Sequence, residues 1–175
     1  LQEEGFNISY PTVCNYIRGK LSEKKEAYIR QEYDLGEVSE FDWGHVKLYL
    51  AGELKNIQIA IFTTAKGNYR CAYLYQNQKM ENFLDAHVKF FNHVGGVHKE
   101  IVYDNMKVAV ARFITQTEKE PTQELLKLSM YYGFNYRFCN VSRGNEKGHV
   151  ERSVEYIRRK VFGKNDTFET LEEAN

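Results

Sequence analysis

The stretch Glu40-Phe41-Asp42-Trp43-Gly44-His45-Val46 decides how the rest of the chain is interpreted. Asp42 is a lone carboxylate near the start of an otherwise apolar, strand-forming run that continues through Leu48 and Leu50. Removing an ionised carboxylate from water costs several kcal/mol unless a cation, a hydrogen-bond donor or a metal ion compensates the charge. A structural salt bridge would satisfy Asp42, and so would a metal ion. The setting of the other carboxylates bears on the choice between these two interpretations.

Composition limits the class of protein. The 175 residues are 42% hydrophobic and 27% charged, which suits one domain with a substantial core and an appendage. The sequence has no run of 18 apolar residues and no secretory leader, so we expect no membrane partner and a cytoplasmic location. Cys14, Cys71 and Cys139 lack the spacing of metal ligands, and we expect reduced thiols.

Charge is balanced over the whole chain but not near its end. The 24 basic and 24 acidic residues cancel, whereas nucleic-acid-binding proteins are usually basic. Residues 137–164 nevertheless hold eight basic and three acidic side chains. This segment is either a solvated basic face or a phosphate-binding surface.

The pattern of apolar residues predicts the element order βββ-α-β-α-β-α. The predicted strands are 38–50, 56–63, 69–75, 100–104 and 135–139. The predicted helices are 80–94, 121–132 and 146–162. Glycine-containing turns join the first three strands into an antiparallel meander, and the last two strands follow helices and should be parallel. We therefore predict an α/β, ribonuclease H-like fold with a mixed five-stranded sheet flanked by helices; residues 105–120 should be irregular and partly mobile.

Changes of composition divide the chain into four parts. Residues 1–20 read as a helical remnant, the end of a helix-turn-helix DNA-binding domain, with Ser9 as a candidate N-cap; a stray amphipathic helix is the alternative. Residues 21–36 form a charged linker. The ribonuclease H-like domain occupies 37–165, and 166–175 should begin a following segment. Both ends interrupt a pattern, so we expect a fragment of a longer protein.

Three carboxylates are expected to meet at one edge of the sheet. Asp104 ends the fourth predicted strand, and the C-terminal strand edge is the usual ligand crevice of an open α/β sheet. Glu151 borders the apolar stripe of the last helix, from which it can reach both the sheet rim and solvent. The stripe consists of Val150, Val154, Ile157 and Val161. Glu146 competes with Glu151, although an acid at the helix entrance also suits the helix dipole.

Converging carboxylates suit divalent metal chemistry. Mg²⁺ prefers hard oxygen ligands, and bound cations relieve the repulsion between neighbouring acids. Two ions about 4 Å apart can activate a water or a 3′-hydroxyl and stabilise the leaving oxygen of a phosphodiester. Each acid also has an ordinary explanation: Asp42 as a salt-bridge partner, Asp104 as a turn residue and Glu151 as a solvated helix residue. The histidines show no ligand spacing, so we expect no zinc.

Three motifs resemble the acidic motifs of the retroviral-integrase superfamily. They are Phe41-Asp42-Trp43-Gly44, Tyr103-Asp104-Asn105 and Arg143-Gly144-Asn145-Glu146-Lys147-Gly148-His149-Val150-Glu151-Arg152. The last motif and the residues after it resemble bacterial insertion-sequence transposases of the IstA type. The resemblance covers essentially the whole chain. Two positions depart from it: Met106 stands where relatives often have Gly, and Glu155 where many integrases have a basic residue.

The resemblance implies a DDE transposase that cleaves transposon-end DNA and transfers the freed 3′-hydroxyl into target DNA. Asp42, Asp104 and Glu151 would be its catalytic, metal-binding acids, with two Mg²⁺ ions, or Mn²⁺ as a substitute. Its partners would be both DNAs, further copies of the chain in a homodimer or higher oligomer, and an AAA+ ATPase helper, at the bacterial nucleoid. The side chains expected to bind DNA are Arg143, Lys147, Arg152, Arg158 and Arg159.

Two other functions remain open at this point. A metal-dependent nuclease on the same fold would cut DNA without joining ends. A non-catalytic DNA-binding or assembly module would keep the fold without the chemistry, although three intact acids argue against a decayed site. Detection of joined as well as nicked products separates the transposase from both.

Overall fold

The structure is a computed structural model that describes residues 9–22, 32–115, 118–139 and 151–175. The chain divides into two compact units, Leu1–Glu32 and Tyr33–Asn175. The first holds one helix, α1 (Tyr10–Ser22), preceded by Ser9, whose hydroxyl lies 2.8 Å from that of Thr12. No helix in the described ranges is long and apolar enough to cross a membrane.

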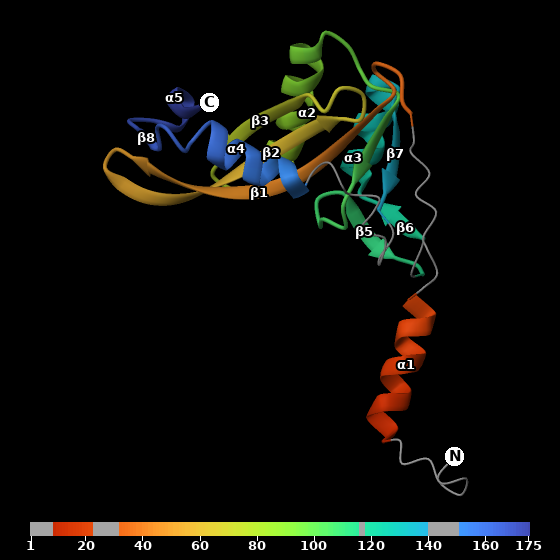
Figure 1. Cartoon of the computed structure of the whole chain (residues 1–175). Coiled ribbons are helices and arrows are strands. Elements are labelled where there is room, and N and C mark those ends of the chain that lie inside the picture. Colours follow the sequence, from red (N-terminus) through yellow and green to blue (C-terminus); the bar gives the residue numbers. More distant parts are fainter. Residues whose placement is uncertain (1–8, 23–31, 116–117, 140–150) are drawn as a thin grey trace, which may run out of the picture. The chain divides into compact units, whose positions relative to one another are not determined.

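The larger unit is built on one mixed sheet (Figure 1), in the order β3-β2-β1-β4-β7. Its strands are β1 (Val38–Leu50), β2 (Glu53–Thr64), β3 (Arg70–Tyr75), β4 (Glu100–Tyr103) and β7 (Asn135–Phe138). The β3–β2–β1 pairs are antiparallel, whereas β4 pairs in parallel with both β1 and β7. The predicted directions of these five strands are therefore confirmed, and a short sixth strand, described below, joins the same sheet.

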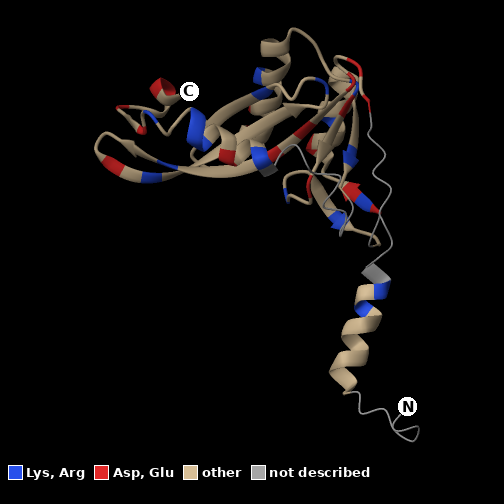
Figure 2. Cartoon of the chain, viewed as in Figure 1, with Lys and Arg blue, Asp and Glu red and all other residues tan. Residues whose placement is uncertain are grey.

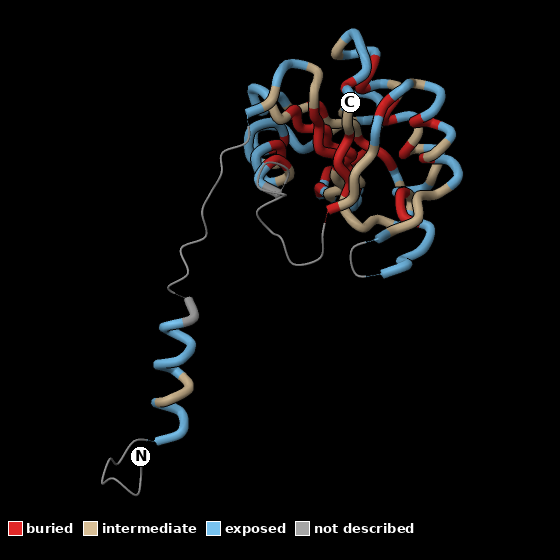
Figure 3. The backbone as a smooth tube through the Cα atoms, turned by 90° about the vertical axis from the view of Figure 1, so that its right-hand side faces the viewer, coloured by how far each residue is buried: buried red, intermediate tan, exposed pale blue. Residues whose placement is uncertain are grey.

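Helices cover both faces of this sheet (Figure 1). On one face, α2 (Met80–Val94) and α3 (Gln123–Tyr132) pack over an aromatic core that includes Phe41. On the other, α4 (Glu151–Lys160) and α5 (Leu171–Ala174) pack over a smaller aliphatic core. Figure 3 shows the buried residues, in red, gathered inside the larger unit. Because side chains alternate along a strand, Asp42 belongs to the face that α4 covers.

The helix ends follow their sequence signals. Thr122 caps α3 by accepting the Leu125 N–H at 3.3 Å. Gly95 and Gly133 end α2 and α3 in the left-handed conformation, which glycine adopts at no steric cost.

Residues 105–120 differ from our prediction. We expected an irregular segment, but its described part contains β5 (Val110–Phe113), which pairs antiparallel with β6 (Lys119–Pro121) in a separate two-stranded sheet. Ala109 and Val110 are buried, and the Ala109 carbonyl accepts the Thr122 N–H at 2.9 Å. These contacts tie the hairpin to the start of α3, a constraint that local polarity could not reveal.

The end of the chain also differs in detail from our expectation. Helix α4 stops at Lys160, so Val161 leaves the apolar stripe and is 55% exposed, while Phe162 turns to the core instead. The predicted helix start at 146 and Val150 lie outside the described residues. A short strand, β8 (Thr167–Phe168), pairs with the far end of β1. Residues 166–175 contact the larger unit through β8, and their role as the start of a following segment stays a prediction.

Helix α4 lies close to β1 at Gly44. A methyl group added there would lie 2.7 Å from Val154 Cγ1 and 3.0 Å from Ile59 Cγ2. The missing side chain of Gly44 is therefore what allows the helix to lie this close to the strand.

His87 is fully buried against the aromatic core. His87 donates its Nδ1 hydrogen to the Phe83 carbonyl at 2.6 Å, and its Nε2 accepts the Tyr103 hydroxyl at 2.8 Å. Complete burial lowers the pKa of His87 to about 4 and raises that of Tyr103 well above its ordinary value. Both groups are thus neutral in the fold, and the pair satisfies two polar groups at the centre of the core.

Replacing Gly44 by alanine should destabilise the larger unit. The added methyl group overpacks the α4–β1 contact, at a cost of about 1–3 kcal/mol in the free energy of unfolding. Urea denaturation measures this loss, and Val154→Ala in the same chain should recover part of it by removing the colliding methyls. Gly96→Ala, where the new methyl meets open space, is the matched control. Unchanged stability of Gly44→Ala would contradict the close approach.

Acid should destabilise the fold through His87. Its folded pKa of about 4 lies below the ordinary 6.5, so between these values the unfolded chain takes up a proton that the folded chain does not. The contribution of His87 to the free energy of unfolding is complete above pH 6.5 and falls by up to about 1.4 kcal/mol per pH unit as the pH drops toward 4. Urea denaturation across this range should show a shallower pH slope for His87→Gln. Equal slopes for the wild-type protein and His87→Gln would refute the assignment.

Candidate active site

The parallel pairing of β1 with β4 brings Asp42 and Asp104 together. The last paired residues of the two strands are Phe41 and Tyr103, and each aspartate follows its strand's paired residue by one position. Because neighbouring strands lie about 4.8 Å apart, the two backbones carry these acids side by side where β4 ends. Both side chains are half-buried. Two of the three predicted acids thus lie at neighbouring positions beside the C-terminal end of β4.

The backbone orients Asp42. Its Oδ1 accepts the N–H of Trp43 at 2.9 Å, and across the sheet it faces Ile61, a member of the core under α4. Trp43 belongs to the opposite face, where its ring packs edge-on against Phe41 and Tyr75 at centroid distances of 5.6 and 5.9 Å. The tryptophan therefore anchors the strand in the aromatic core next to the acid.

Glu151 is the first residue of α4, and the structure describes its backbone but not its side chain. Val154 lies against Gly44, Ile157 packs with the core residues farther along β1, and Phe162 contacts Phe168, which pairs with Leu50. Helix α4 therefore runs in the direction of β1, and its first turn lies on the Asp42 side of Gly44. The third predicted acid begins the helix at the end nearest to the other two.

The predicted DNA-binding residues divide into three groups. Arg143 and Lys147 lie outside the described residues. Arg152 and Arg159 are exposed, and the guanidinium of Arg159 lies 3.8 Å from the carboxylate of Glu155, one turn earlier in the helix. Arg158 donates from Nε to the His45 carbonyl of β1 at 2.6 Å, so its guanidinium is held against the strand. Figure 2 colours the basic residues of α4 blue along the helix.

Two carboxylates of the predicted metal-binding set, those of Asp42 and Asp104, are described by the structure. Among the side chains that the structure describes, no three His, Cys, Asp or Glu residues form a group that could hold a metal ion. The Glu151 side chain is not among them. Asp42 and Asp104 supply the carboxylate oxygens that Mg²⁺ prefers, so the chemistry of the two described acids fits this metal.

Sequence reasoning missed a row of polar side chains beneath α4. Glu40, Thr63 and Arg70 are direct partners across β1, β2 and β3, and Glu40 and Thr63 are buried. Ser153 of α4, also buried, contacts Thr63 and Arg70. The signal in the sequence was weak, because a single threonine in a strand is common.

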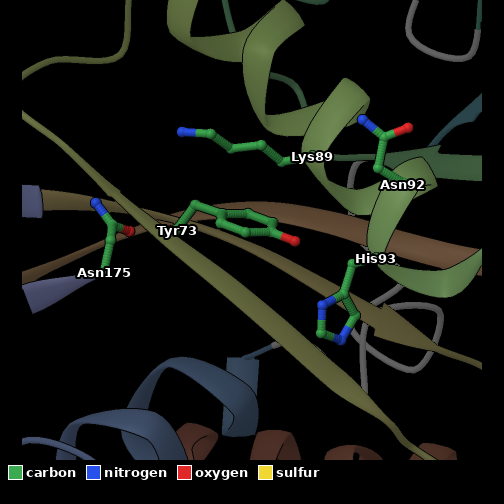
Figure 4. A pocket seen from close by; sticks show the side chains of 5 residues that line it. All are labelled: Tyr73, Lys89, Asn92, His93 and Asn175. Carbon is green, nitrogen blue, oxygen red and sulfur yellow. The ribbon is translucent and has the colours of Figure 1, made fainter.

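A hollow of about 460 Å³ lies elsewhere, between β3, α2 and the last residue of the chain. Figure 4 shows the side chains that line it: Tyr73, Lys89, Asn92, His93 and Asn175. Lys89 is paired with Asp85 at 2.9 Å, and the Asn175 amide bonds the backbone of Leu74 on the edge of β3. Neither Asp42 nor Asp104 lines this hollow, so it is separate from these two acids.

Comparisons with known proteins show which family this chain resembles. Residues 1–25 match the model of the Mu-like transposase middle domain. The transposase for insertion sequences IS1326/IS1353 of Pseudomonas aeruginosa is 33% identical over 98% of this chain, and the same element's transposase from Shigella flexneri matches equally well. The transposase for IS21 of Pseudomonas aeruginosa is 28% identical over 77% of the chain. The chain spans only about a third of the length of these relatives: 35%, 35% and 34%.

Solved structures show the same fold at low sequence identity. The simian T-cell lymphotropic virus intasome, solved with a PP2A regulatory subunit, contains a chain with a TM-score of 0.62 and 14% identity, covering 84% of this chain and 48% of that one. The HTLV-2 integrase catalytic core domain in complex with magnesium gives a TM-score of 0.55 and 15% identity, covering 74% and 71%. The chain therefore belongs to the family of bacterial insertion-sequence transposases, and its larger unit has the ribonuclease H-like fold of retroviral integrase catalytic cores.

Proposed function

We propose that this chain carries the catalytic part of a transposase, which cleaves the DNA ends of a mobile element and joins them to target DNA. The observation that carries the proposal is the parallel register of β1 and β4, which puts Asp42 and Asp104 at neighbouring positions. The direction of α4, which begins with Glu151 on the same side, adds to it. The transposase names of the homologous proteins support the same reaction class.

Asp42, Asp104 and Glu151 would hold the divalent metal, two Mg²⁺ ions or Mn²⁺ in their place. When bound, such ions activate a water or a 3′-hydroxyl and stabilise the leaving oxygen of a phosphodiester. The chain's own contribution is placement: β1 and β4 fix two carboxylates before any ligand arrives, and the Trp43 N–H orients one of them. An HTLV-2 core with this fold was solved with magnesium, which is consistent with the choice of metal.

The basic residues of the last motif and of α4 would hold the DNA backbone near these acids. They are Arg143, Lys147, Arg152, Arg158 and Arg159. A guanidinium has five N–H donors, and the bond from Arg158 to His45 uses one of them. Arg158 can thus be held by the protein and still donate to a phosphate.

The assembly would contain more than one copy of the chain. Joining two element ends to one target requires two active sites, and we propose a homodimer or higher oligomer on DNA. The HTLV-2 core was described in dimeric and trimeric forms. An AAA+ ATPase helper and a bacterial cytoplasmic, nucleoid-associated location complete the proposal.

The reaction is tested with the full-length transposase, duplex DNA carrying the element's ends, and Mg²⁺ or Mn²⁺. Joined as well as nicked products are expected. Nicked products alone would favour a nuclease on the same fold. Intact DNA under all conditions, with DNA binding preserved, would favour a non-catalytic module.

Asp104→Asn should abolish cleavage and leave DNA binding intact. The amide keeps the shape of the side chain and removes the charge that a metal needs, so the rate should fall by more than about 100-fold, the upper end for residues that only orient a ligand. Cleavage and filter-binding assays on the full-length protein measure both effects. Asp166→Asn, an exposed acid at the far end of the sheet, should behave as wild type. Wild-type cleavage by Asp104→Asn would overturn the assignment.

Arg158→Ala should weaken DNA binding without disturbing the fold. Loss of one phosphate contact reduces the slope of log K against log salt by about one, whereas the lost bond to His45 costs only about 1 kcal/mol of stability. Salt titrations of binding and urea denaturation report these two effects separately. Lys89→Ala removes a charge from the opposite face of the sheet and serves as the control. An unchanged salt slope for Arg158→Ala means that this basic surface is only solvated.

A further inference from the structure

The first turn of α4 rests on a buried polar contact. Ser153 and Thr63 are both fully buried. Thr63 donates its hydroxyl to Ser153 Oγ at 3.0 Å, and Arg70 donates its Nε hydrogen to the same oxygen at 2.8 Å. The two lone pairs of the serine oxygen are thus both engaged. Strands β2 and β3 therefore hold the helix at one atom, two residues after Glu151.

Arg70 holds the helix at a second place. Its guanidinium carbon lies 4.7 Å from the centre of the Tyr156 ring, within the range of a cation–π contact. Ser153 and Tyr156 are three residues apart and so lie on the same side of the helix. Arg70 spans the first and second turns, and the half-buried side chain fixes both relative to β3.

These contacts restrain a movement that apolar packing leaves open. Apolar contacts are non-directional, so the pair Val154–Gly44 sets how closely α4 approaches the sheet but constrains sliding and rotation weakly. Hydrogen bonds weaken steeply with distance and angle, and a buried hydroxyl that loses its partner costs about 1–3 kcal/mol. The position of α4 along and around its axis is therefore set by the contacts of Ser153 with Arg70 and Thr63, together with the bond from Arg158 to the His45 carbonyl.

We infer that Arg70, acting with Thr63 through the Ser153 hydroxyl, is a positioning residue that sets Glu151 against Asp42 and Asp104. The inference rests on the proposed function, because it assumes that the three acids share a metal site. Two of them are fixed by strand pairing, whereas Glu151 is carried by a helix with its own degrees of freedom. Like-charged carboxylates repel one another, so the helix that carries the third must be held from the opposite side.

The experiment measures metal binding directly, in the full-length transposase without DNA, from the electron paramagnetic resonance signal of free Mn²⁺. Arg70→Ala should weaken Mn²⁺ binding about 10-fold, the size of effect seen when the group that orients a metal ligand is lost. In cleavage assays kcat should fall while KM for DNA stays unchanged. Arg112→Ala, which removes an exposed arginine of β5, should leave Mn²⁺ affinity and kcat unaltered.

Two further variants separate positioning from folding. Thr63→Val keeps the shape of the side chain and removes its hydroxyl, so it should weaken Mn²⁺ binding in the same direction as Arg70→Ala even where the latter folds poorly. In the Ser153→Ala background, Arg70→Ala should weaken Mn²⁺ binding by less than in the wild-type chain, because the bond to Ser153 is already lost and only the contact with Tyr156 remains. A lower unfolding midpoint with wild-type Mn²⁺ affinity per folded molecule would show an ordinary structural role and overturn the inference.

Asp42→Asn and Asp104→Asn are the reference for the site itself. If both lose Mn²⁺ binding while Arg70→Ala and Thr63→Val retain it, the positioning role is wrong and the proposed function stands. If both bind Mn²⁺ as wild type does, the metal site fails, and the proposed function fails with it.

Discussion

The parallel pairing of β1 with β4 is the constraint on which the rest of the larger unit depends. Two parallel strands cannot be joined by a tight turn, so the chain must cross over before it can run beside itself in the same direction. Here β2, β3 and α2 provide that crossover, and α2 covers the aromatic face on the way. Because β1 is much longer than β4, Asp42 lies inside a strand while Asp104 lies at a strand end. One register thus places two acids from distant parts of the sequence.

The third acid, Glu151, is placed by a helix and not by strand pairing. Helix α4 has no register to follow, and it contributes few apolar side chains, chiefly Val154 and Ile157. Its place is determined by tertiary contacts: the absent side chain of Gly44, the bond from Arg158 to β1, and the polar contacts of Ser153. The placement of the two aspartates therefore follows from backbone hydrogen bonding between strands, whereas the position of α4 depends on a few specific side chains.

This difference explains how far the sequence alone could predict the structure. Alternation in β1 and the apolar run of β4 were strong local signals, so the sheet and the places of Asp42 and Asp104 followed from them. The hairpin of β5 and β6 and the short strand β8 involve few residues whose pairing is decided by distant contacts. The end of α4 was missed because the turn after Lys160 brings Gly163 close to the helix, where an added side chain would lie 2.4 Å from the Arg159 carbonyl oxygen, and the apolar pattern does not show this approach.

The two aspartates are held by a close-packed aromatic core, whereas α4 is held by fewer contacts. Tyr103, one residue before Asp104, is fully buried and bonded to His87, and Phe41, one residue before Asp42, packs against both rings. Moving either acid would disturb the aromatic core, which is close-packed and resists small displacements. Moving α4 would disturb a smaller aliphatic core and the contacts of Ser153, Tyr156 and Arg158. A metal held by all three acids, as proposed, would therefore find two ligands in place, and the seating of α4 would determine the position of the third.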